Sequence, residues 1–446
     1  MALRRRMLVA FAAVAALFAL PFAVEGQGSG FNSALPLTHV DNAPNSAWAQ
    51  QQHYVVLVSL DGFRWDYAAR DHAEHLLALG KHGAWAPQGM LPSYPSVTFP
   101  NHITLVTGLY PEHHGIVANE FYDPARKATY AMKDKNAVTD GSWYSGTPLW
   151  SLAESQGMHA AVLLWPGSEA EIAGFRPTWY ARWDAETANS PAALQARIDN
   201  VVTLLRLPPA DRPHFVAIYY PEPDHEGHES GPDSSATRKA VLKMDAEIGK
   251  LKSVLDSTGL PIDLVVVSDH GMARTEGGWI NLDSFTNLMG FETAGSLLYT
   301  TDEQDRVRVY NQLKKASSEF TVYRLKDVPP ELNYNQNQRE GDPVVVATGP
   351  FAIRATAPEG GIDRAPPLGM HGFDPAKVPE MKASFFAAGP DILPGKTVAP
   401  FENVNLYPWI AHMLGLEPAK NDGSLNILAG TLRDNGGEQE KTEQDK

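Results

Sequence analysis

Aspartate and histidine residues stand directly after several apolar, β-rich stretches of this sequence, or in a loop between glycines. Carboxylates and imidazoles, without thiols, are a donor set that suits zinc. In open α/β sheets the active site forms at the carboxyl ends of the strands, so side chains in these places can meet at one sheet edge. The candidates are Asp61, Asp224, His228, Asp269, His270 and His371. Three carboxylates and three imidazoles are chemically suited to a pair of zinc ions.

Several of these positions also allow a purely structural interpretation. Asp61 precedes a glycine, and Asp-Gly is common turn chemistry. Asp224 and His228 lie in a segment rich in proline and glycine, which is also typical of a solvated surface loop. The adjacent pair Asp269 and His270 closes a strongly apolar stretch, where a structural purpose is hard to find. For that pair metal binding is the stronger interpretation.

Thr98 is the candidate nucleophile. Pro100 suits the first turn of a helix through residues 103–107, which places Thr98 at or near the N-cap. One interpretation is a capping threonine. The other is a hydroxyl held where the helix dipole and free backbone N–H groups attract an anion. The residues alone leave both interpretations open.

Composition excludes some classes of function. The chain has 446 residues, a formal net charge of −15 and no cysteine. Such an acidic chain is a poor candidate for binding a nucleic-acid duplex, which requires basic patches. Without cysteines there is no disulfide framework and no thiolate zinc site. If the chain acts on phosphates, bound metal ions must reverse the local charge.

The N-terminal residues have the pattern of an export signal. Three arginines at 4–6 precede an apolar run over residues 7–24, so residues 1–26 are predicted to be a signal peptide, with a retained membrane anchor as the alternative. Export predicts a secreted protein or one of the bacterial periplasm. Residues 27–52 are predicted to be a flexible lead-in, and residues 432–446 a disordered tail.

Between these ends, apolar stretches alternate with helix-like stretches. This alternation predicts one catalytic α/β domain over residues 53–431, with a mostly parallel sheet covered by helices on both faces. Residues 300–381 are less regular and form a candidate cap or insertion. The expected strands are 54–60, 159–165, 214–220, 263–268, 342–348 and 384–388. The expected helices are 65–82, 147–156, 192–205, 234–255 and 404–414.

Six short segments, in order along the chain, resemble the nucleotide pyrophosphatase/phosphodiesterase family (type I phosphodiesterases) of the alkaline phosphatase superfamily. The resemblance covers residues 54–374. The segments are 57–62 (LVSLDG), 98–102 (TFPNH), 107–119 (TGLYPEHHGIVAN), 222–228 (EPDHEGH), 267–272 (VSDHGM) and 371–374 (HGFD). The resemblance implies an alkaline-phosphatase-like fold and two Zn²⁺ per subunit.

The resemblance also implies a role for each matched residue. One zinc would be held by Asp224, His228 and His371. The second would be held by Asp61, Asp269 and His270, with Thr98 completing its coordination. Thr98 would attack phosphorus to form a phosphothreonine intermediate, and the Asn119 amide would stabilise the negative charge. Phe99 and Tyr219 match positions whose rings can sandwich a nucleobase, although core packing explains such aromatics equally well.

The expected substrate is a small phosphodiester, with nucleotides cleaved to nucleoside 5′-monophosphates. Phosphomonoesterases of the superfamily carry extra cationic groups, and the comparable stretch 164–169 (LWPGSE) contains none. The alternatives are a phosphomonoesterase and a lipid-directed choline phosphodiesterase of the same superfamily. A non-catalytic zinc-binding module is a further alternative, but such a module would have no need of Thr98. No membrane contact is expected beyond the N-terminal segment.

Overall fold

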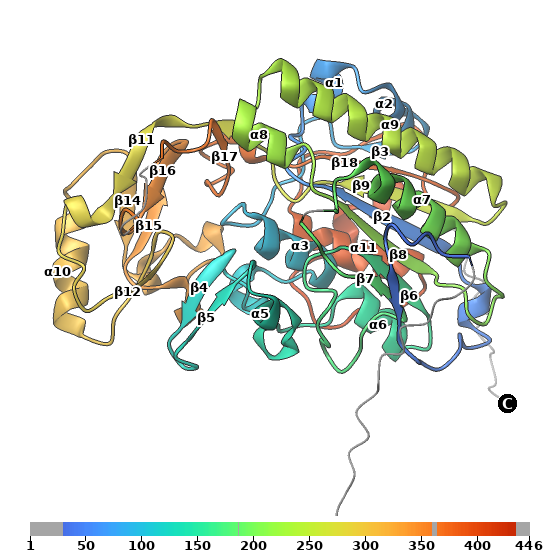
Figure 1. Ribbon diagram of the computed structural model, residues 1–446, viewed down its shortest axis with the longest axis horizontal. Helices are drawn as coiled ribbons and strands as arrows, with labels where there is room; N and C mark the ends of the chain where they lie inside the picture. Colours follow the sequence, from blue (N-terminus) through green and yellow to red (C-terminus); the bar gives the residue numbers. More distant parts are fainter. Residues whose placement is uncertain (1–29, 186, 359–363, 434–446) are drawn as a thin grey trace, which may run out of the picture.

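The computed structural model describes residues 30–185, 187–358 and 364–433 (Figure 1). Its centre is a nine-stranded sheet in which five neighbouring strands run parallel: β7, β6, β8, β2 and β9. In spatial order the strands are β1 (Leu37–His39), β7 (Trp179–Ala181), β6 (Ala160–Leu163), β8 (Phe215–Tyr220), β2 (Tyr54–Leu60), β9 (Ile262–Val267), β18 (Phe385–Ala388), β3 (Ala84–Trp85) and β19 (Lys396–Thr397).

The central strands are buried on both faces. Every residue of β2 and β8 is buried, as expected for continuous apolar runs between two helical layers. β18 runs antiparallel to β9 and to β3, so the sheet is mixed at that side. The predicted α/β fold, with a mostly parallel central sheet, is confirmed.

Helices cover both faces of the sheet (Figure 1). On one face lie α1 (Tyr67–Asp71), α2 (Glu74–His82), α7 (Pro191–Leu205) and α9 (Ser235–Ser257). On the other lie α3 (Thr98–Thr107), α6 (Leu149–Ser155) and α11 (Leu406–Met413). The remaining α-helices are α4 (Pro111–His114), α5 (Lys135–Thr139), α8 (Asp224–Ser230) and α10 (Glu303–Leu313).

Two predicted helices differ from the observed ones. The single helix expected over 65–82 is broken into α1 and α2, because His72 adopts a left-handed conformation at φ 60° and ends α1. The first turn of the helix expected over 404–414 is instead a 3₁₀ turn, Asn403–Asn405, which leads into α11.

The predicted flexible lead-in is wrong for the described residues 30–52. β1 in this segment pairs antiparallel with β7 at the edge of the main sheet. Asn45 is buried, and its side-chain amide donates to the carbonyls of Pro209 and Arg212 at 2.8 and 2.7 Å. Polar side chains of this segment, such as Asn45, form hydrogen bonds with residues far away in the sequence. The amino-acid composition of the segment alone does not reveal such partners.

A second group of small sheets lies beside the main body, at the left of Figure 1. It has its own apolar core, which includes Leu282, Leu298, Val309 and Val345. This group begins near residue 273, before the predicted insertion boundary at residue 300. Its strands are β10 (Ala273–Arg274), β11 (Glu276–Asn281), β12 (Glu292–Ala294), β13 (Leu297–Tyr299), β14 (Phe320–Tyr323), β15 (Val344–Ala347), β16 (Phe351–Arg354) and β17 (Gly369–Met370). A separate hairpin pairs β4 (Glu120–Asp123) with β5 (Ala128–Ala131).

The predicted signal peptide and the predicted disordered tail lie at the two ends of the chain. Residues 1–29 and 434–446 lie outside the described residues, so the signal peptide stays a prediction, as does the disorder of the tail beyond Arg433. Leu432, which was assigned to the tail, forms a bridge with Ile392 and belongs to the folded body. None of the helices in the described part of the chain has the length and apolar character that crossing a membrane requires.

Candidate active site

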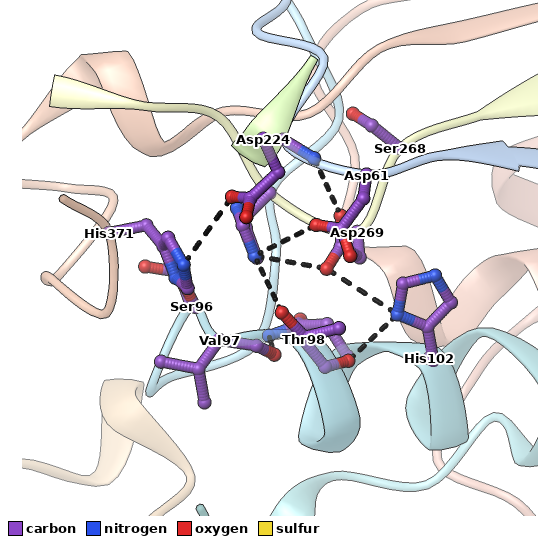
Figure 2. Close-up of polar contacts among 12 residues, drawn as sticks. Asp61, Ser96, Val97, Thr98, His102, Asp224, Ser268, Asp269 and His371 are labelled. Carbon is purple, nitrogen blue, oxygen red and sulfur yellow. Dashed lines mark hydrogen bonds and ion pairs between the residues drawn. The ribbon is translucent and has the colours of Figure 1, made fainter. Parts of the chain in front are cut away.

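Three carboxylates meet at the carboxyl ends of the central strands. Asp61 follows β2, Asp224 begins α8 after β8, and Asp269 stands two residues after β9. Gly62 allows the close approach of the first two: its φ is 64°, and a Cβ at this position would lie 2.8 Å from the Asp224 Cβ. The strand order β8-β2-β9 therefore brings the three predicted carboxylates together (Figure 2).

The three predicted histidines all use one ring nitrogen to contact the backbone. The Nδ1 atoms of His228, His270 and His371 lie 2.8, 2.9 and 3.0 Å from the carbonyl oxygens of Gly369, Gly271 and Ser96. A carbonyl only accepts, so each Nδ1 carries the proton and donates it. Each Nε2 then presents a lone pair, which is the tautomer that a metal ligand requires.

The first group of converging atoms belongs to Asp224, His228 and His371. The Nε2 atoms of the two histidines lie 3.1 Å apart. The carboxylate oxygens of Asp224 lie 3.3 Å from the His228 Nε2 and 3.5 Å from the His371 Nε2. With both Nδ1 atoms protonated, these close contacts join acceptors to acceptors. A cation bound among these atoms would remove the repulsion between them. Two imidazoles and one carboxylate are a ligand set that suits zinc.

The second group belongs to Asp61, Asp269 and His270. The His270 Nε2 lies 3.0 Å from the Asp269 Oδ2 and 3.5 Å from the Asp61 Oδ1. Neither of these two carboxylate oxygens, nor Asp224 Oδ1, has a hydrogen-bond partner among the described residues, although all three atoms are buried. Buried charged atoms without partners are costly, so these orphaned oxygens fit a bound divalent cation.

The electrostatics of the site indicate uncompensated charge. Burial and the negative charges of Asp269 and Asp224 raise the pKa of Asp61 well above its ordinary value. Burial and the neighbouring His270 lower the pKa of His371 to about 3, so this imidazole stays neutral. For His228 and His270, burial lowers the pKa, but the carboxylates of Asp224 and Asp269 outweigh it and raise the pKa above its usual value. The site therefore favours a neighbouring positive charge, and a metal cation bound to the deprotonated imidazoles would supply it.

Thr98 lies beside the second group. It is the first residue of α3, the residue is 8% exposed, and its Oγ1 lies 3.4 Å from the His270 Nε2. The N-cap residue is Val97, and Thr98 makes no side-chain capping bond. The capping interpretation therefore fails, and the hydroxyl faces the carboxylate–imidazole cluster at a helix N-terminus (Figure 2).

Asn119, just before β4, is tied to the start of the same helix. Its Oδ1 accepts the backbone N–H of Phe99 at 2.9 Å. This bond fixes the orientation of the amide, so the donor end of Asn119 is the part that remains for a ligand. Phe99 itself is partly buried against the core, and its ring lies edge-on to Tyr130.

Tyr219 does not have the surroundings of a nucleobase platform. The residue is only 7% exposed, and its hydroxyl donates to the Asp61 Oδ2 at 2.6 Å. These surroundings favour core packing, the other explanation that the sequence allowed, and they place the hydroxyl on a candidate metal ligand. Trp183, whose ring contacts that of Tyr219 at a centroid distance of 5.5 Å, is 37% exposed and is the better placed aromatic surface.

Sequence reasoning missed two residues of this site. His102 is buried, with its Nδ1 2.8 Å from the Thr98 carbonyl oxygen and 3.4 Å from the Asp269 Oδ2, and its Nε2 2.8 Å from the Ser59 Oγ. Its spacing of four residues from Thr98 on one helix was an available signal. Trp183 gave no comparable signal, because it lies in an irregular segment after β7.

A substitution at Tyr219 separates its two candidate roles. We expect Tyr219→Phe to weaken metal binding or kcat by about 10- to 100-fold, because it removes the hydrogen bond that orients Asp61. The KM for an aromatic substrate should change little once metal is saturating. The check is a metal titration of both proteins followed by steady-state kinetics. A large rise in KM with unchanged metal affinity would instead restore the stacking role.

Comparisons with known proteins agree with this geometry. The family model described as type I phosphodiesterase/nucleotide pyrophosphatase matches residues 55–374, a span that contains all ten predicted site residues. The chain belongs to this family. The predicted family and the predicted enzyme class, a hydrolase, are thereby confirmed.

Relatives of this phosphodiesterase family member come from distant organisms. An uncharacterized pyrophosphatase/phosphodiesterase of Schizosaccharomyces pombe is 33% identical over 84% of this chain and 79% of its own length. Ectonucleotide pyrophosphatase/phosphodiesterase family member 3 of Mus musculus is 32% identical over 84% of this chain. A venom phosphodiesterase of Macrovipera lebetinus is 32% identical over 88%. The chain spans only 44% and 47% of the length of the mouse and viper proteins.

A solved structure has the same fold. Murine ectonucleotide pyrophosphatase/phosphodiesterase 5 superposes with a TM-score of 0.78 and 28% identity, over 86% of this chain and all of that chain. The solved form is an inactive threonine-to-alanine variant in complex with AMP.

Proposed function

We propose that this chain hydrolyses phosphodiester and pyrophosphate bonds of nucleotides, releasing nucleoside 5′-monophosphates, with Thr98 as the nucleophile and two Zn²⁺ per subunit. The observation that supports the proposal most strongly is the position of the Thr98 hydroxyl. It lies at a helix N-terminus, 3.4 Å from the His270 Nε2, beside carboxylate oxygens without hydrogen-bond partners among the described residues.

The metal ligands divide into two sets. Asp224, His228 and His371 would hold one ion, and the second would be held by Asp61, Asp269 and His270 with the Thr98 oxygen. Zinc at these positions would lower the pKa of a bound hydroxyl group and offset charge on the phosphate oxygens. Tyr219 and the three backbone carbonyls keep the ligand side chains in their binding orientation.

The reaction then takes two displacements. The Thr98 oxygen, its proton released, forms a bond to phosphorus as the bond to the leaving oxygen breaks. The product of this step is a phosphothreonine diester that still carries the nucleoside. Water attacks the same phosphorus from the side that the leaving group vacated, and the Thr98 oxygen recovers a proton. Asn119, oriented by the Phe99 N–H, would donate to a phosphate oxygen in both steps.

A diester substrate is favoured over a monoester by the charge of the surroundings. A monoester brings one more anionic oxygen, and the stretch 164–169 beside α3 offers no lysine or arginine for it. Trp165 in this stretch is buried, and its indole N–H donates to the His102 carbonyl. Phe99 and Trp183 supply aromatic surface for a base, and the murine neighbour in complex with AMP supports a nucleotide substrate.

A substrate panel on the zinc-loaded protein tests the proposal. The 4-nitrophenyl ester of thymidine 5′-monophosphate should give a higher kcat/KM than 4-nitrophenyl phosphate or 4-nitrophenyl phosphorylcholine. Trp183→Ala should raise the KM for the thymidine ester by about 5- to 100-fold, the range that base stacking implies, and leave bis(4-nitrophenyl) phosphate unaffected. Trp48→Ala, at another exposed tryptophan, is the matched control. A monoester or choline ester turned over fastest would contradict the proposed substrate class.

A further inference from the structure

Three ligand-type side chains meet at the other edge of the main sheet. His53 immediately precedes β2, Asp263 is the second residue of β9, and Asp391 follows β18. β2 and β9 are parallel and begin at this edge, whereas the antiparallel β18 ends there. The cluster is therefore separated from Asp61 and Asp269 by the length of the strands.

The geometry of the cluster is compact. The His53 Nδ1 lies 3.0 and 2.9 Å from the two carboxylate oxygens of Asp391. The Asp263 Oδ1 accepts the backbone N–H of Asp391 at 3.1 Å. One ligand atom from each of the three residues falls within 4.8 Å of the others. Zinc-bound nitrogen and oxygen atoms, each about 2.0–2.2 Å from the ion, stand about 3–3.6 Å apart, so small side-chain shifts suffice.

An independent observation points to a missing ligand. Asp263 is 0% exposed, and within the described part of the chain its Oδ2 has no hydrogen-bond partner although that atom is buried. The chain also keeps space for this carboxylate: a Cβ on Gly389 would lie 2.2 Å from the Asp263 Oδ1. The cluster thus combines two crowded carboxylates with one imidazole, and the positive charge of Arg433 lies close enough to act on Asp263.

We propose that His53, Asp263 and Asp391 bind a divalent cation of the zinc or manganese class. One imidazole with two carboxylates suits these ions, while Ca²⁺ and Mg²⁺ prefer more oxygen ligands than the cluster offers. The side chain of His53 is 37% exposed, which leaves a path for the ion and room for water ligands. The role is structural: the ion ties together three segments that are far apart in sequence and stabilises the folded state by binding to it.

The chemical competitor is a proton. If Asp263 is protonated, its hydroxyl can donate to Asp391 and remove the repulsion without a metal. The two explanations differ in metal stoichiometry, which does not depend on whether the proposed catalytic reaction is correct.

The experiment measures bound zinc and manganese by elemental analysis after chelation, reloading and gel filtration, in the full chain and in His53→Ala, His53→Gln and Asp263→Asn. His82→Ala, at an exposed histidine of α2, is the matched control. We expect each cluster variant to bind one equivalent fewer than the unmodified and control proteins. We also expect a smaller metal-induced rise in Tm, with kcat/KM on the thymidine ester within twofold of the unmodified enzyme. Equal stoichiometry and equal Tm shifts in all five proteins would overturn the proposal and assign the cluster to a shared proton.

Discussion

Thr98→Ala is expected to lower kcat on the 4-nitrophenyl ester of thymidine 5′-monophosphate by at least about 10³-fold while both active-site metal ions remain bound. The side chain contributes the attacking oxygen, and no other hydroxyl was identified in the same relation to the His270 Nε2 among the described residues. All six remaining metal-ligand candidates contact one another or the backbone directly, independently of Thr98. Loss of the hydroxyl should therefore affect the chemical step far more than metal retention.

Two further variants distinguish loss of the nucleophilic hydroxyl from a disturbance of the packing of α3. Thr98→Ser keeps the hydroxyl and should retain measurable turnover. Thr107→Ala alters another buried threonine of α3 and controls for helix perturbation. The hydroxyl of Thr107 donates to the Ile103 carbonyl at 2.7 Å and accepts the backbone N–H of Leu109 at 3.3 Å. Metal content and kcat are measured in parallel. If Thr98→Ala keeps its metals and turns over the ester within tenfold of the unmodified enzyme, Thr98 is not the nucleophile.

Asp61→Asn is expected to have opposite effects on stability with and without metal. With zinc present, the variant should lose at least about 100-fold in activity and much of the zinc-induced rise in Tm, because it removes a carboxylate ligand. In chelator, it should be more stable than the unmodified protein. Burial and the charges of Asp269 and Asp224 disfavour an ionised Asp61 in the metal-free state, and an amide of the same shape relieves this repulsion.

Thermal unfolding in zinc and in chelator measures both effects. Asp66→Asn, at a partly exposed carboxylate that pairs with Arg64 outside the cluster, is a control for the loss of a charge. The account is contradicted by a fall in the Tm of Asp61→Asn in chelator together with an unchanged rise on adding zinc. That result would mean that Asp61 stabilises the fold without a metal.

The positions of the main strands, and their mostly parallel arrangement, were accessible to sequence reasoning because two-sided burial leaves continuous apolar runs. The apolar run 54–60 coincides with β2. The polar residue that follows such a run marks the edge of the sheet where the candidate metal ligands meet. His371 was predicted from its glycine-flanked loop and the family resemblance, since β17, the strand that precedes it, is only two residues long. Short elements of this kind have no periodicity to detect.

The failures have specific physical causes. The residues 30–52 satisfy their polar groups through distant partners, such as the carbonyls of Pro209 and Arg212, and this is invisible in local composition. For Tyr219 the sequence left stacking and core packing equally open, because it does not reveal that the hydroxyl donates to Asp61. The break at His72 depends on a left-handed residue other than glycine, which propensity arguments do not anticipate.

The stereochemical course at phosphorus tests the two-displacement mechanism most directly. The measurement uses a thymidine phosphorothioate diester of known configuration, hydrolysed in isotopically labelled water by the zinc-loaded enzyme. Attack by Thr98 followed by attack by water inverts the phosphorus twice, so the account predicts overall retention of configuration. Net inversion would show a single direct attack by water and would contradict the central role of Thr98.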